Sequence, residues 1–216
     1  MYDYFLFDWD GCLYNSISVW IRAYKKTFEL YGLYIPKRDI PVKIMGDKSA
    51  PIKLGLPQEK VDDFYAYVFE EYNNLISKKP LDSLFAPHAK ETLKELKRLK
   101  KNICIVTSSW RSSVSPILKK SNVKKYIDFI ISWEDVTCLK PNPEPILKAI
   151  NTYKASFDKV IMVGDSSKDI LAGKAAGIST VLYFPTYHKK IYSIERLKKL
   201  KPDYIFYSFI DLLSLI

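Results

Sequence analysis

Short apolar segments alternate with segments of helical periodicity over most of the chain. The apolar segments are rich in β-branched and aromatic residues and are bounded by polar residues, proline or glycine, which is the pattern of buried β-strands. They comprise residues 4–7, 102–107, 126–132, 158–165, 179–184 and 202–207.

Between these predicted strands, apolar side chains recur at the spacing of a helix face, as Leu93, Leu96 and Leu99 do within 88–101. The other predicted helices are 113–122, 142–153 and 165–177. Strand followed by helix, repeated from residue 86 onward, predicts an α/β fold: a Rossmann-like parallel sheet with helices on both faces. Such sheets bind ligands at the carboxyl ends of their strands.

Residues 15–81 interrupt this alternation. Segments 16–32 and 60–76 are amphipathic and rich in aromatic residues, and no strand pattern separates them. Gly32 marks the expected end of the first helix, because glycine is common just after a helix C-terminus. We predict that 15–81 forms a helical domain inserted into an α/β core made of residues 1–14 and 82–216.

Basic residues are unevenly distributed. The formal net charge is +10, and between residues 89 and 125 lysine and arginine far outnumber the acidic residues. Such a surface favours anions, but this stretch shows no interleaved aromatic residues and no nucleic-acid recognition motif. We therefore interpret it as a solvated helix face and expect no nucleic-acid partner.

The three cysteines, Cys12, Cys104 and Cys138, lie far apart and show no metal-ligand spacing, which fits a reducing compartment better than a disulfide framework. Met1 is followed by YDYFLF, which is not a basic leader, and no apolar run has membrane length. We expect a soluble cytoplasmic protein without a membrane partner, either a monomer or a homodimer.

Two aspartates, Asp8 and Asp10, directly follow the first predicted strand. In extended backbone they point the same way and Trp9 points away, and Gly11 then allows a sharp turn. Two carboxylates about 4 Å apart repel by roughly 4 kcal/mol at an effective dielectric constant of 20. Aspartates also end strands as turn formers, but a close pair indicates a bound cation or a shared proton.

Further polar residues follow other predicted strands, and in a parallel sheet all of them meet at one edge. They are Asp165 and Asp169, Lys140, and the hydroxyl-bearing Thr107, Ser108 and Ser109. Carboxylates suit a hard divalent cation, with Mg²⁺ as the usual partner when phosphate oxygens are present. Lysine, hydroxyls and backbone amides are the groups that bind a phosphoryl group.

In their order along the chain, these clusters resemble the four motifs of the haloacid dehalogenase-like phosphatase superfamily. The matching residues are Asp8-Trp9-Asp10-Gly11, Thr107, Lys140 and Gly164-Asp165-Ser166-Ser167-Lys168-Asp169. The segments KPNPEP and GDSSKD are most similar to the phosphoglycolate phosphatase and β-phosphoglucomutase branch. The resemblance spans nearly the whole core and implies that the inserted helical domain is a cap.

The resemblance implies catalytic and substrate-binding roles for five positions. Asp8 would be the nucleophile that forms an aspartyl-phosphate, and Asp10 would be the general acid and then the general base. Thr107 and the amide of Ser108 would hold phosphoryl oxygens. Lys140 would neutralise charge on the nucleophile and the phosphate.

The resemblance also implies a Mg²⁺ site formed by Asp8, the backbone carbonyl of Asp10, and Asp165. Asp169 would act from behind these ligands by orienting metal-bound water or Lys140.

Some of these positions have ordinary structural explanations. Ser166 and Asp169 have the spacing of a capping box variant, so Asp169 can cap its helix as well as serve the site. His88 and His188 have no partner at metal-ligand spacing, and we assign both to structural roles. Cys12 stands where this branch commonly has threonine, a change that keeps the size and loses a hydroxyl.

The sequence thus predicts a Mg²⁺-dependent phosphatase that acts on a small phosphomonoester, phosphoglycolate-like or a sugar phosphate. A phosphomutase of the β-phosphoglucomutase type would use the same core residues, and a binding protein on the same fold would not need them. The intact Asp8, Asp10, Lys140 and Asp165 favour an enzyme. Specificity would come from the inserted domain, where no motif is readable.

Overall fold

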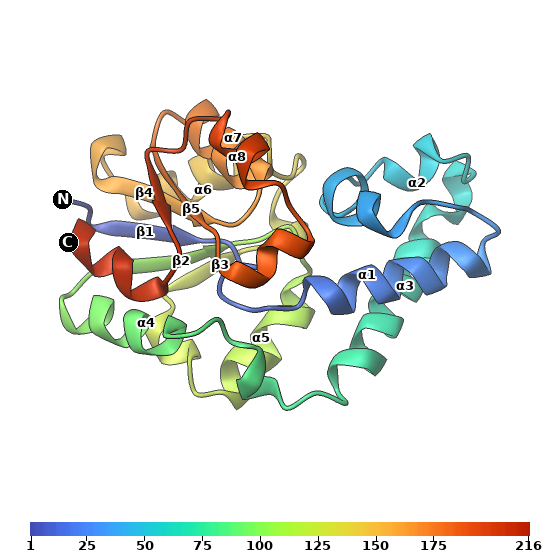
Figure 1. Ribbon diagram of the computed structural model, residues 1–216, viewed down its shortest axis with the longest axis horizontal. Coiled ribbons are helices and arrows are strands. Elements are labelled where there is room, and N and C mark those ends of the chain that lie inside the picture. Colours follow the sequence, from blue (N-terminus) through green and yellow to red (C-terminus); the bar gives the residue numbers. More distant parts are fainter. The chain divides into compact units, whose positions relative to one another are not determined.

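A computed structural model describes residues 1–216 and contains one six-stranded parallel sheet, with strand order β3-β2-β1-β4-β5-β6 (Figure 1). The strands are β1 (Tyr4–Phe7), β2 (Asn102–Val106), β3 (Phe129–Ile131), β4 (Val160–Gly164), β5 (Ser179–Tyr183) and β6 (Tyr204–Phe206). The chain adds β2 and β3 on one side of β1, and β4, β5 and β6 on the other. The predicted parallel α/β fold is confirmed, and its topological switch point lies between β1 and β4.

Helices cover both faces of this sheet (Figure 1). One layer contains α4 (Ala89–Arg98) and α5 (Arg111–Lys120), and the other contains α6 (Glu144–Tyr153), α7 (Ser167–Ala175) and the short α8 (Ile194–Lys198). Leu6 of β1 is in register with Cys104 of β2 and Met162 of β4. These three side chains belong to one buried cluster with Ile146 of α6 and Ala172 of α7. Burial on both faces explains why the strands read as continuous apolar runs.

The chain divides into two compact units, one made of Met1–Asn15 and Phe85–Ile216, the other of Ser16–Leu84. The second unit contains α1 (Ile17–Leu30), α2 (Ala50–Lys53) and α3 (Val61–Ile76), and no strand. Aromatic rings join α1 to α3: the ring centroids of Trp20 and Tyr72 are 3.7 Å apart, and those of Phe28 and Phe64 are 5.2 Å apart. Gly32 follows α1 with a φ of 66°, a left-handed conformation that ends the helix without a Cβ clash.

The chain leaves and re-enters the sheet-containing unit at neighbouring points. Tyr14 forms an isolated antiparallel bridge with Phe85. Beside it, the Ala86 N–H donates a hydrogen bond of 3.0 Å to the Leu13 carbonyl. The inserted residues therefore begin and end at one place on that unit.

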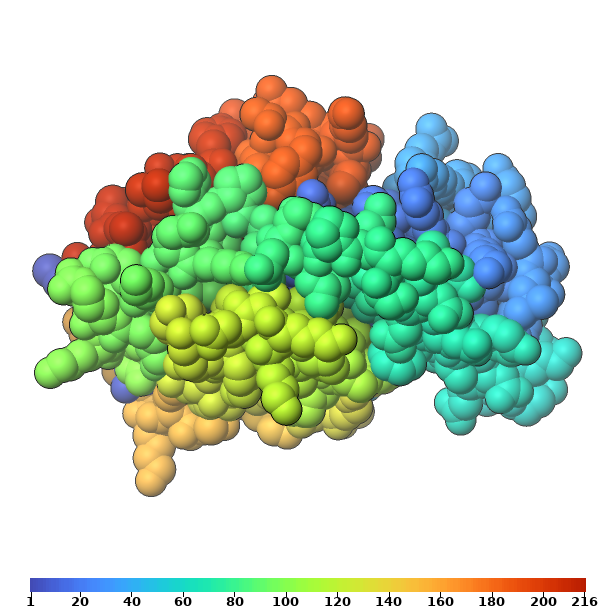
Figure 2. Space-filling view, turned by 90° about the horizontal axis from the view of Figure 1, so that it is seen from below, coloured from blue at the N-terminus to red at the C-terminus, as the bar shows by residue number.

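The basic stretch lies on the surface formed around α4 and α5, which Figure 2 shows in green and yellow. Several of its cations are paired with acidic residues: Lys97 with Asp128, Arg98 with Glu95, Lys101 with Asp3, and Arg111 with Asp135. These pairs neutralise part of the local positive charge. None of the helices combines the length and the apolar character needed to cross a bilayer.

Candidate active site

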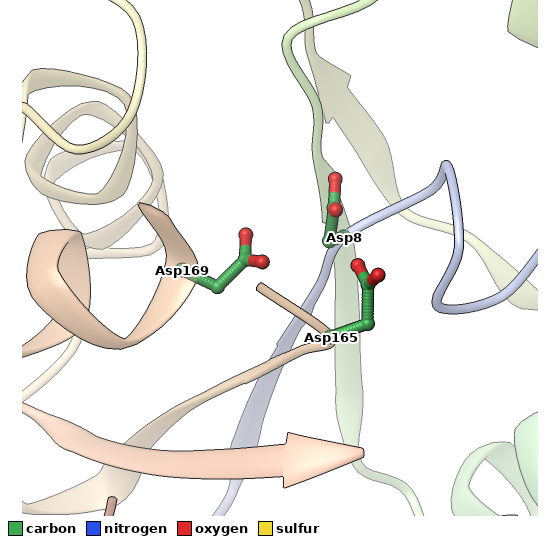
Figure 3. A group of neighbouring side chains, drawn as sticks. All are labelled: Asp8, Asp165 and Asp169. Atoms are coloured by element: carbon green, nitrogen blue, oxygen red, sulfur yellow. The ribbon is translucent and has the colours of Figure 1, made fainter. Parts of the chain in front are cut away.

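The candidate site lies at the carboxyl edge of the sheet, beside the switch point. Asp8 is the first residue after β1 and Asp165 the first after β4, and the register pairs Phe7 with Val163 in these neighbouring strands. Asp169 comes from the first turn of α7. Figure 3 shows the three carboxyl groups gathered together, and each offers an oxygen within 4.8 Å of the others. All three residues are buried.

Asp169 is held through both of its carboxylate oxygens. Oδ1 accepts a hydrogen bond of 2.6 Å from the Lys140 ammonium. Oδ2 accepts from the Ser166 hydroxyl at 2.6 Å and from the Ser166 N–H at 3.1 Å, which completes the capping box. The same side chain thus caps α7 and contacts Lys140. Both carboxylate oxygens of Asp169 already accept hydrogen bonds. Asp169 is therefore better suited to orient Lys140 than to bind a metal ion directly.

Lys140 is the buried cation of the site. Its ammonium Nζ lies 2.8 Å from Asp8 Oδ1 and 2.6 Å from Asp169 Oδ1, and it donates a 2.8 Å hydrogen bond to the Val106 carbonyl. Burial by itself would lower the pKa of Lys140, but the carboxylates of Asp169 and Asp8 outweigh it and raise the pKa above its usual range. Lys140 therefore stays charged at neutral pH.

Negative charge nevertheless exceeds positive charge at this site. Burial, followed by the charge of Asp169, raises the pKa of Asp8 to about 7 even though Lys140 opposes the shift. Burial, followed by the charge of Asp8, also raises the pKa of Asp165 well above its usual range. Asp165 Oδ2 is buried and accepts no hydrogen bond. Hard oxygen donors, excess negative charge and an unpartnered buried carboxylate oxygen fit a divalent cation of the Mg²⁺ type.

Asp10 stands apart from the three clustered carboxylates. It is half-buried, and its Oδ2 accepts a hydrogen bond from the Ser109 hydroxyl. The preceding Trp9 is fully buried and stacks on Tyr14, with ring centroids 4.8 Å apart. Gly11 makes the turn at a φ of 88°. The sequence analysis did not predict the contact between Ser109 and Asp10. Its only indication was that Ser109 follows Thr107 and Ser108 at the end of a predicted strand.

The end of β2 supplies hydrogen-bond donors. Thr107 is buried, and its Oγ1 accepts a 3.0 Å hydrogen bond from the Ser109 N–H, so its own hydroxyl proton remains available to a further acceptor. Ser108 is half-buried, and its backbone N–H donates to no protein acceptor. A loop that presents a hydroxyl and a free N–H beside buried carboxylates is suited to binding an oxyanion.

Cys12, at the position where threonine is common in the resembling branch, is buried in the turn after β1. Its Sγ–H donates to the Val163 carbonyl at 3.5 Å. Burial raises the pKa of the thiol, so Cys12 remains neutral and takes the place of a small hydrogen-bond donor.

His188, to which the sequence analysis assigned a structural role, lies beside the candidate site. Its side chain is fully buried, and Nδ1 lies 3.9 Å from Asp165 Oδ2. No sequence spacing links these two positions, because the contact depends on how the segment after β5 folds back over the sheet edge. The other histidine, His88, is exposed at the start of α4.

The chain matches the family model of haloacid dehalogenase-like hydrolases over residues 5–183. The chain belongs to this family. It is 33% identical to pyrophosphatase PpaX of Halalkalibacterium halodurans over 215 residues, which cover 98% of this chain and 95% of that protein. The resemblance drawn from the motifs is thus confirmed, and this haloacid dehalogenase-like hydrolase is an enzyme, as predicted.

Solved structures share the fold of this haloacid dehalogenase-like hydrolase. A hydrolase from Pseudomonas syringae superposes with a TM-score of 0.83 at 22% identity, covering 98% of this chain and 96% of that one. A variant of CbbY from Rhodobacter sphaeroides, solved with xylulose-(1,5)bisphosphate, superposes with a TM-score of 0.80 at 19% identity over 98% of this chain and 96% of its own.

Proposed function

We propose that this hydrolase is a Mg²⁺-dependent phosphatase that acts on small phosphorylated metabolites through an aspartyl-phosphate at Asp8. The observation that carries the proposal is the contact of 2.8 Å between Asp8 and the buried Lys140 ammonium, beside the unpartnered carboxylate oxygen of Asp165. A carboxylate nucleophile, a fixed positive charge and a cation-binding oxygen are the groups that phosphoryl transfer requires in one place.

In the first half of the proposed reaction, an Asp8 oxygen attacks phosphorus and the bond to the leaving oxygen breaks. Asp10 gives its proton to that leaving oxygen. Lys140, the Ser108 N–H and the Thr107 hydroxyl donate to phosphoryl oxygens and stabilise the charge that develops on them.

In the second half, water attacks phosphorus and the bond to Asp8 breaks, which releases inorganic phosphate and restores the carboxylate. Asp10 takes the proton of that water, and the Ser109 hydroxyl holds Asp10 in place throughout. Asp8, Asp165 and the Asp10 carbonyl are the proposed Mg²⁺ ligands. The ion would supply positive charge to the phosphoryl oxygens.

Inorganic pyrophosphate is a second candidate substrate. It is favoured by the 33% and 30% identity to proteins named pyrophosphatase PpaX over nearly the full chain. Attack on pyrophosphate uses the same nucleophile, and the leaving phosphate needs less protonation than an alkoxide does. Phosphate release should therefore be compared for pyrophosphate, phosphoglycolate and sugar phosphates, each with Mg²⁺ and with EDTA. Transfer of phosphate between sugar positions without its release would indicate a mutase instead.

Asp8→Asn provides the decisive variant, since an amide is a poor nucleophile and a poor Mg²⁺ ligand. We expect it to reduce phosphate release from the best substrate to background while the far-ultraviolet circular dichroism spectrum is unchanged. Asp158→Asn, at an exposed carboxylate just before β4, is the matched control and should keep wild-type activity. Wild-type turnover by Asp8→Asn would contradict the proposal.

A further inference from the structure

The segment that follows β5 encloses His188 in aromatic rings. Four rings meet its imidazole edge to face, with centroid distances of 6.1, 5.9, 4.8 and 5.8 Å; they belong to Tyr183, Phe184, Tyr187 and Tyr192. The backbone of His188 is also fixed, because its N–H donates to the Pro185 carbonyl and its carbonyl accepts from the N–H groups of Ile191 and Tyr192. The fold therefore holds this imidazole in one place.

Two buried polar groups face each other at this point, and neither has a hydrogen-bond partner. His188 Nδ1 and Asp165 Oδ2 are 3.9 Å apart, and the structure gives neither atom a hydrogen bond. Buried polar atoms nearly always have a partner. A direct hydrogen bond needs the two atoms to approach by about 1 Å.

Both forms of the imidazole can act as a donor, because a neutral ring carries an N–H on one nitrogen and a protonated ring carries an N–H on both. The imidazole nitrogens of His188 are not part of the candidate metal-binding cluster, which consists of carboxylate oxygens of Asp8, Asp165 and Asp169.

We infer that His188 is a positioning residue for Asp165: its Nδ1–H donates to Asp165 Oδ2 and leaves the other carboxylate oxygen directed at the cation. The inference rests on the Mg²⁺ site proposed above. Ligating carboxylates are usually hydrogen-bonded in turn by a surrounding group, which fixes their orientation and raises metal affinity. The structure gives Oδ2 of Asp165 no hydrogen bond. Tyr192 is the other donor beside this carboxylate, since a side-chain hydrogen bond to Asp165 contributes to the raised pKa of its hydroxyl.

Mg²⁺ binding measured by isothermal titration calorimetry tests this role. His188→Leu removes the donor and keeps apolar bulk, and should weaken Mg²⁺ binding by about 10- to 100-fold. His188→Asn, which can place an N–H near the position of Nδ1, should recover most of the affinity. His88→Leu is the matched control at an exposed histidine and should bind as the wild type does.

The outcomes separate the two proposals. Wild-type affinity in His188→Leu would overturn the role of His188 and leave the metal site standing. A wild-type protein that binds no Mg²⁺ would overturn the metal site itself.

A second measurement uses the wild-type protein and so does not depend on how the variants fold. The chain contains two histidines, so ¹⁵N-histidine labelling gives two imidazole spin systems, which His88→Leu assigns. In the Mg²⁺-loaded protein, the inference requires the Nδ1–H tautomer of His188. Observation of the Nε2–H tautomer would overturn the inference.

Discussion

At the scale of single residues, the site depends on Gly164 as much as on its charged groups. A Cβ at this position would lie 2.2 Å from Asp169 Cγ. Asp169 cannot yield easily, because one of its oxygens is bonded to Lys140 and the other to Ser166. The absence of a side chain at the end of β4 is therefore what allows α7 to bring its acid to the buried lysine.

We expect Gly164→Ala to displace Asp169 and thereby to lower kcat/KM by at least about 10-fold, alongside an overpacking cost of about 1–3 kcal/mol. Gly173→Ala is the matched control, since its Cβ would meet Thr180 Cγ2 of β5 at 2.4 Å, and its nearest neighbours include no atom of Asp8, Asp165 or Asp169. The two variants should lose comparable stability in thermal unfolding, while only Gly164→Ala loses activity. If the two variants had equal kcat/KM and equal stability, the position of Asp169 beside Lys140 would not contribute to activity.

At the scale of elements, Asp128 connects helices α4 and α6, which lie on opposite faces of the sheet, to strand β2. Its Oδ2 accepts hydrogen bonds from the Ile103 N–H of β2 at 2.7 Å and from the Tyr153 hydroxyl of α6 at 2.9 Å, and its Oδ1 accepts from Lys97 of α4. Burial tends to raise the pKa of Asp128, but the hydrogen bonds from Lys97, Ile103 and Tyr153 together lower it below 3.8. The ionised carboxylate is therefore the form that connects α4, β2 and α6.

Because the folded-state pKa of Asp128 lies below its unfolded value, its stabilising effect is present above that unfolded value and is lost as pH falls through the folded one. We expect Asp128→Asn to lower the free energy of unfolding by about 1–3 kcal/mol at pH 7. The difference from the wild type should shrink between about pH 5 and pH 3. Urea unfolding at both ends of this range provides the measurement, and a constant difference would contradict the argument.

At the scale of the whole molecule, the sheet-containing unit holds all the candidate site residues. The inserted residues leave it and return where Tyr14 and Phe85 are bridged, so their removal does not open a strand of the sheet. The inserted unit packs its own aromatic core between α1 and α3. The resemblance drawn from the sequence assigns substrate selection to this insertion.

We therefore predict that replacing residues 16–84 by a short Gly-Ser linker gives a chain that still unfolds cooperatively and still binds Mg²⁺. We expect the intact chain to prefer small phosphorylated metabolites over phosphopeptides. The truncated chain should lose this preference, because the remaining unit contains the phosphoryl-binding groups alone. Circular dichroism melts and the ratio of kcat/KM for the two substrates test both parts. A truncated chain that keeps the wild-type ratio would place specificity in the core.

The sequence by itself indicated the six strands and the longer helices, but not the short α2 and α8. Strands buried on both faces read as continuous apolar runs, and one-sided burial gives a helix a period of 3.6 residues, and both patterns are local. The sequence also indicated that Asp8, Lys140 and Asp165 would share one edge of the sheet, since all of them follow parallel strands. The spacing of Ser166 and Asp169 also indicated the cap of α7. Only the tertiary structure decided that β4 lies next to β1, that Asp169 contacts Lys140 directly, and that His188 lies beside Asp165. Strand order and side-chain approach depend on packing between residues far apart in the chain, and such packing leaves no fixed spacing in the sequence.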